Sequence, residues 1–160
     1  MRSNESFNKL FNIPYLCEYF LSLGADINKK LLDERTALQI AAHYNSKEAA
    51  EFLISHGVDI NEKNDMGFTF LHLAAGHNCK ETVELLLSYG LDINKKDVNG
   101  FTPLYMATKS NYIETAEFLI SHGANINEIN EFGETVLQIA EKRNYSELAK
   151  LLLSHGAIYH

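Results

Sequence analysis

The sequence contains no tryptophan, only two prolines and only two cysteines. Cys17 and Cys79 are too few for a disulfide framework, so we expect a reducing, intracellular and cytoplasmic setting. Basic residues are also scarce, because 14 lysines and arginines stand against 21 aspartates and glutamates, for a net charge of −7. A chain this acidic has no general attraction for phosphate backbones, so we expect no nucleic acid partner.

Long apolar runs are missing as well. Segments such as 85–87 and 151–153 are far shorter than the roughly 18 residues of a membrane span, and the polar start of the chain lacks an apolar stretch of signal-peptide length. We therefore expect no membrane insertion and no export signal. The sequence also lacks a Walker A loop, a G-x-G-x-x-G loop, an H-E-x-x-H pair and a C-x-x-C pair. These absences favour a protein that is not an enzyme and that needs no cofactor or metal.

The sequence does contain a strong internal repeat with a period of 33 residues. Three sets of residues keep that spacing: Gly24, Gly57, Gly90, Gly123 and Gly156; Thr36, Thr69, Thr102 and Thr135; Asn45, Asn78, Asn111 and Asn144.

Each unit reads as a helix, a turn, a second helix and a loop. In the unit at 95–127, Thr102 and Pro103 are a typical helix start, and Asn111 suits the left-handed end of that helix. Glu114 suits the first turn of the second helix, which Gly123 ends. Helices of about eight to ten residues are marginal alone, so neighbouring units must stack.

The period and the signature T-P-L-H-x-A are typical of ankyrin repeats. Residues 69–75 (TFLHLAA) and 102–107 (TPLYMA) match the signature best, and 36–42 and 135–140 match it less fully. The chain thus resembles the ankyrin-repeat family over nearly its whole length. The resemblance implies an all-α solenoid, a single domain over 1–160 with about five stacked helix–turn–helix repeats and connecting β-hairpin loops. We expect repeats at about 1–28 (a degenerate N-terminal cap), 29–61, 62–94, 95–127 and 128–160.

Several positions depart from the repeat pattern. Ser3 stands where a threonine is expected, and Glu34 replaces a hairpin glycine, so we expect an irregular turn there. Phe70 and Val136 replace the proline of the helix start. A position that holds Ala42, Ala75 and Thr108 holds Glu141 in the last unit, which suits a polar terminal face.

Ankyrin stacks usually meet protein partners through their hairpin tips and the exposed side of their first helices. Carried over by register, the resemblance implies ten candidate partner-binding residues in this chain: Arg35, Tyr44, Met66, Phe68, His77, Phe101, Lys109, Phe132, Lys142 and Arg143.

Phe68 and Phe101 share one repeat position, and Met66 and Phe132 lie close to it in register. Exposed together, they would form an apolar stripe of the kind that marks interfaces. The alternative is that each ring packs on the adjacent hairpin and only stabilises the stack. Lys142 and Arg143 allow two interpretations. They form a basic patch that steers an acidic ligand, or they belong to a solvated face without a binding role.

Histidines and cysteine allow further interpretations. His56, His122 and His155 share one position in the last turn of a helix, where they suit the helix dipole better than a metal site. In the family, a histidine at the position of His72 usually braces the hairpins. His77 and Cys79 lack a third group that would make them a catalytic pair.

The leading functional prediction is a non-enzymatic, monomeric module that binds a protein or peptide. Two alternatives stay open: a regulatory or spacer segment of a larger protein, and a scaffold that self-assembles end to end.

Overall fold

The computed structural model describes residues 22, 24, 26–28 and 36–159, and that part of the chain contains eight helices and no strand. The helices are α3 (Ala37–His43), α4 (Lys47–Ser55), α5 (Phe70–Gly76), α6 (Lys80–Ser88), α7 (Pro103–Lys109), α8 (Ile113–Ser121), α9 (Val136–Lys142) and α10 (Ser146–Ser154). They form four pairs, each with a first helix of seven residues and a second of nine.

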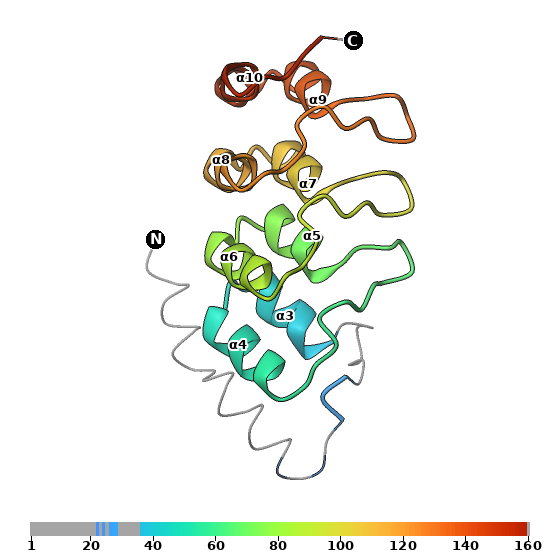
Figure 1. Cartoon of the computed structure of the whole chain (residues 1–160), viewed down its shortest axis with the longest axis vertical. Helices are drawn as coiled ribbons and strands as arrows, with labels where there is room; N and C mark the ends of the chain where they lie inside the picture. The colour runs from blue at the N-terminus through green and yellow to red at the C-terminus, as the bar shows by residue number, and fades with distance from the viewer. Residues whose placement is uncertain (1–21, 23, 25, 29–35, 160) are drawn as a thin grey trace.

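The pairs follow one another along the long axis of the molecule (Figure 1). First helices pack on first helices and second helices on second helices of the neighbouring pair. The loops that connect successive pairs all project to the same side, beyond the first helices. The all-α solenoid expected from the sequence is confirmed.

A threonine begins each first helix. The Thr102 hydroxyl accepts a hydrogen bond from the backbone N–H of Tyr105 at 3.2 Å. In α3 the bonds are reciprocal, because Gln39 donates its backbone N–H to the Thr36 hydroxyl and accepts from the Thr36 N–H at 3.0 Å. Such caps satisfy backbone donors that a helix start leaves free, and each contributes about 1 kcal/mol.

An asparagine turns the chain from the first helix to the second. Asn45, Asn78, Asn111 and Asn144 have φ between 51° and 59°, the left-handed region that asparagine tolerates better than most residues. The expected helix end at Asn111 is therefore confirmed, and the same residue type makes the same turn in each unit.

Two rows of leucines form the spine of the core. Leu38, Leu71, Leu104 and Leu137 come from the first helices, and Leu53, Leu86, Leu119 and Leu152 come from the second helices; all are at most 1% exposed. Burying one such side chain contributes about 1.5–3 kcal/mol. Phe70 and Val136, which replace the proline of the helix start, are also buried in this core.

The connecting loops are tight and share one hydrogen-bond pattern. The side-chain oxygen of Asn64 accepts the backbone N–H groups of Met66 and Phe68 at 3.0 and 2.9 Å. Asp97 and Asn130 do the same in the next two loops, at 2.7–2.9 Å. These bonds fix each loop before any ligand arrives.

Neighbouring loops are also bonded to each other. The Val98 N–H donates to the Met66 carbonyl at 3.1 Å, and the Glu131 N–H donates to the Asn99 carbonyl at 3.0 Å. Gly100 allows the second contact, because a Cβ there would lie 3.1 Å from the Cα of Asn130. The three loops therefore behave as one connected edge of the molecule.

Some expectations concern residues that lie outside the described part of the chain: Ser3, Glu34 and nearly all of the expected repeat at 1–28. Glu141 is exposed, whereas its counterparts Ala42, Ala75 and Thr108 are completely buried. The last helix pair thus presents a charged side chain where earlier pairs present packed ones.

Candidate interaction surface

Three large apolar side chains stand at the tips of successive loops. Met66 is 49% exposed, Val98 63% and Phe132 67%. The inter-loop hydrogen bonds hold the backbones of these tips next to one another. We call Met66, Val98 and Phe132 the tip stripe. It is a preformed apolar row on the side of the molecule to which all loops project (Figure 1).

Phe68 and Phe101 lie behind the tips and are partly buried. The Phe101 ring stacks on Tyr105 with centroids 4.0 Å apart and planes at 5°. The centroid of the Phe132 ring lies 6.0 Å from that of Phe101, with the planes at 30°. Phe68 meets His72 edge-on at 5.6 Å. These two rings therefore support the loops, while Met66 and Phe132 are the members of the predicted stripe that reach solvent.

The other candidates lie at the C-terminal ends of the first helices. Tyr44, His77 and Arg143 cap α3, α5 and α9 in that order, and all three side chains are exposed. Lys109 ends α7 and is exposed too. Arg35 lies outside the described residues.

Lys142, at the end of α9, is paired with Glu134, which comes from the preceding loop. The hydrogen bond from Lys142 is the main reason that the pKa of Glu134 lies below its usual value. Because Lys142 already has a carboxylate partner, the basic patch expected from Lys142 and Arg143 is partly neutralised.

Two members of this surface could not be found from the aromatic repeat position alone. Val98 is aliphatic, so a search for rings misses it, and it lies one residue before Asn99, the position in register with Met66 and Phe132. Tyr105 follows Phe101 by four residues, and that spacing is the signal that predicts their stacking. The same spacing recurs in the stacked pairs Phe52–His56 and Phe118–His122.

His72 joins one unit to the next. It is completely buried; its Nδ1 accepts the Thr69 N–H at 3.2 Å, and its Nε2–H donates to the Phe101 carbonyl at 2.9 Å. Burial lowers the pKa of His72. The bracing role that the resemblance implies for this histidine is therefore visible in its contacts.

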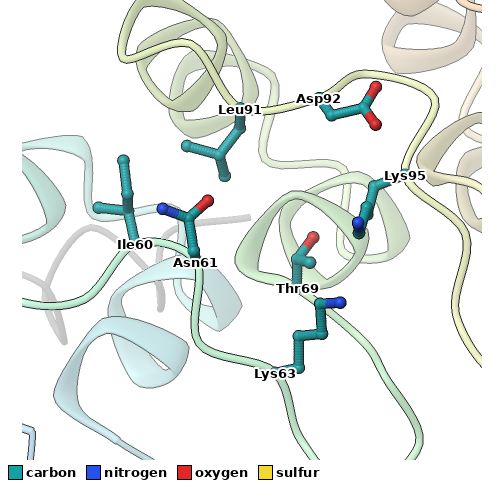
Figure 2. A pocket seen from close by; sticks show the side chains of 7 residues that line it. All are labelled: Ile60, Asn61, Lys63, Thr69, Leu91, Asp92 and Lys95. Atoms are coloured by element: carbon teal, nitrogen blue, oxygen red, sulfur yellow. The ribbon is translucent and has the colours of Figure 1, made fainter.

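A surface depression of about 260 Å³ lies between the loops that follow α4 and α6 (Figure 2). Figure 2 shows Ile60, Asn61 and Leu91 on one side and Lys63, Thr69, Asp92 and Lys95 on the other. Small-molecule sites are usually at least 300 Å³ and mostly apolar. This small depression, with five polar residues among the seven that line it, does not fit that description.

Cys79 has the environment of a structural thiol. It is buried, its Sγ donates to the Ala42 carbonyl, and burial raises the pKa of the thiol to about 11. A nucleophilic cysteine needs the opposite shift. Within the described residues, no three His, Cys, Asp or Glu side chains come together in a way that could hold a metal ion.

No helix in the described residues is long and apolar enough to cross a membrane. The family model described as "Ankyrin repeats (3 copies)" matches residues 9–97 and 92–160. A search of curated proteins finds no significant match.

Proposed function

The chain belongs to the ankyrin-repeat family, whose members are generally non-enzymatic protein–protein interaction modules, and from that premise we propose that it binds a protein partner through its loop tips and the adjoining first helices. One observation supports this choice of face: the tip stripe exposes three large apolar side chains on loops that are hydrogen-bonded to one another. Exposed apolar groups that form a row mark interaction sites more often than scattered ones do.

The rigidity of the loops favours binding. Each loop is closed by two hydrogen bonds to the side chain of Asn64, Asp97 or Asn130, so little conformational entropy is lost when a partner docks. Phe132 rests on Phe101, which rests on Tyr105. An exposed ring supported from below is a suitable anchor for the centre of an interface.

The charge of the surface indicates the chemistry of the partner. Exposed Asp65 and Glu131 lie beside Met66 and Phe132 at the tips, and the whole chain carries −7. We expect a partner with an apolar patch bordered by lysine or arginine. The apolar contacts would set most of the affinity, and the border charges would mainly raise the association rate. An intracellular, reducing compartment agrees with the free thiol of Cys79.

The test compares two variants in affinity capture from lysate, followed by titration of each purified partner. The first carries Met66→Ser, Val98→Ser and Phe132→Ser. The matched control carries Tyr89→Ser and Leu153→Ser, which remove exposed apolar side chains from the second-helix side. Circular dichroism establishes that both variants are folded.

We expect the tip variant to bind the purified partner at least about thirtyfold more weakly, as for the loss of one strong anchor, and the control to bind like the wild type. Phe101 is left intact because its removal would also disturb the packing on Tyr105. A partner that both variants bind equally well would show that the tip stripe is not the binding face.

A further inference from the structure

Two exposed histidines from neighbouring units meet at the C-terminal ends of α3 and α5. The Nδ1 of His43 and the Nε2 of His77 lie 3.1 Å apart, and the ring centroids are 4.2 Å apart with planes at 77°. His43 also meets Tyr44 edge-on at 4.9 Å. The pair lies at the opposite end of the first helices from the loops that carry the tip stripe.

This pair is not part of the repeat pattern. Residues in register with His43 are Gly76, Lys109 and Lys142; those in register with His77 are Tyr44, Ser110 and Arg143. Stacking of the units therefore does not require a histidine at either position. The two rings that meet belong to residues 34 positions apart, one more than the period.

The other described histidines have their ring nitrogens occupied in a different way. In His56, His122 and His155 the Nδ1 bonds to a carbonyl of the same helix at 2.8–2.9 Å. His72 is buried and uses both nitrogens. Within residues 36–159, His43 and His77 are thus the histidines that direct nitrogens from two units toward one point on the surface.

We propose that His43 and His77 form a two-ligand site for a divalent transition-metal ion of the zinc type. Zinc binds imidazole nitrogen at about 2.0–2.1 Å, so two ligands at the tetrahedral angle lie about 3.3–3.4 Å apart. The observed separation of 3.1 Å is within a few tenths of an ångström of that value. Both side chains are exposed, and neither ring is part of the packed core.

The ligand set defines the protonation states. The bound ion takes the lone pairs of His43 Nδ1 and His77 Nε2, so His43 keeps its proton on Nε2 and His77 keeps its proton on Nδ1. The remaining coordination positions hold water or a donor from a partner. With two protein ligands instead of the four of a structural zinc site, the dissociation constant is about 1–100 µM.

Binding would tie the second unit to the third. The two ligands come from different units, so an ion held by both stabilises the packing of α3 against α5. The unfolded chain has no preformed site for the ion, so binding favours the folded state. At a hundredfold excess over the dissociation constant, the thermal unfolding midpoint rises by about 5–10 °C.

The experiment titrates zinc chloride into the untagged chain by isothermal calorimetry at neutral pH. We compare the wild type with His43→Gln, with His77→Gln and with His122→Gln as a matched control, an exposed histidine at the end of a second helix. Wild type and control bind one ion with the same constant, and each of the other variants loses affinity by at least about tenfold, because the chelate needs both rings. The zinc-dependent rise in the unfolding midpoint disappears in the same two variants.

Three results overturn the proposal: no binding by the wild type at 1 mM zinc, unchanged affinity in both pair variants, and a loss in only one of them. The second would assign the ion to another part of the chain, and the third would leave a single imidazole as its ligand. Each outcome is independent of the tip stripe, so failure of the metal site and failure of the tip stripe as a binding surface can be distinguished.

Discussion

Replacing His72 tests how two units are joined. In His72→Leu, the Thr69 N–H loses its partner, and the Phe101 carbonyl keeps only the hydrogen bond from the Asp97 N–H. An unsatisfied buried backbone group costs about 1–3 kcal/mol and a lost hydrogen bond about 1 kcal/mol, so this variant should lose about 2–4 kcal/mol of unfolding free energy. His72→Gln should lose only about 1 kcal/mol, because Gln39 and Gln138 make the corresponding cap bond in their own units.

The same position makes the stability depend on pH. Burial lowers the pKa of His72 in the folded state, whereas the unfolded chain takes up the proton near the ordinary value of 6.5. The unfolded state therefore binds more protons between the two values. The stabilising effect of neutral, buried His72 is fully present above about pH 6.5 and is lost as the pH falls through the lower, folded-state value.

Urea unfolding followed by circular dichroism at pH 8 and pH 5 measures this effect. The deficit of His72→Gln relative to the wild type should shrink at pH 5, by at most about 1.4 kcal/mol per pH unit, because glutamine does not titrate. All other ionisable groups are common to both proteins and cancel in the difference. An equal deficit at both pH values would refute the argument that His72 is held neutral by burial.

Three further substitutions test the loops and the core. Gly100→Ala should cost at least about 1 kcal/mol more in urea unfolding than Gly133→Ala, because both glycines have φ of +75° but only at Gly100 would a Cβ approach Asn130 within 3.1 Å; equal costs would disprove the close contact. In a Cys17→Ser background, iodoacetamide should alkylate Cys79 at pH 8 at least about a hundredfold more slowly in buffer than in urea, since its pKa is raised to about 11; equal rates would contradict its burial. Asp97→Asn should raise the unfolding midpoint by about 2–4 °C, because it removes a buried charge whose Oδ2 lacks a hydrogen-bond partner, while asparagine makes the same loop bonds at Asn64 and Asn130; a lower midpoint would show that the carboxylate charge is stabilising.

The helix pairs could be predicted from the sequence because the 33-residue period recurs both in the residues that end the helices and in the residues that form the core. Thr102 and Asn111 mark the start and end of a first helix locally, and the same residues return 33 positions away with the same roles. Stacking then places Leu104 over Leu71 and under Leu137 without any further information. The local signals and the packing of the repeats specify the same arrangement, so the helices and the core follow from the sequence pattern.

The candidate site was less predictable, because exposure depends on small offsets within a loop. Phe68 and Phe132 both belong to the predicted stripe, yet Phe132 stands at a loop tip and Phe68 two residues behind one. The His43–His77 contact has a related cause. A search at the repeat period compares His43 with Gly76 and so cannot find a pair that is offset by one residue.

The hydrogen bonds between neighbouring units also limit how far apart in sequence the contacting residues are. They join residues 29 to 37 positions apart, from the His72–Phe101 bond to the Thr115–Asn78 bond. Folding rates fall as the mean sequence separation of contacts grows relative to chain length. A further unit would lengthen the chain while leaving this separation unchanged. Its docking would close a loop of about one period, so the entropic barrier to adding a unit is set by 33 residues and not by the length of the array.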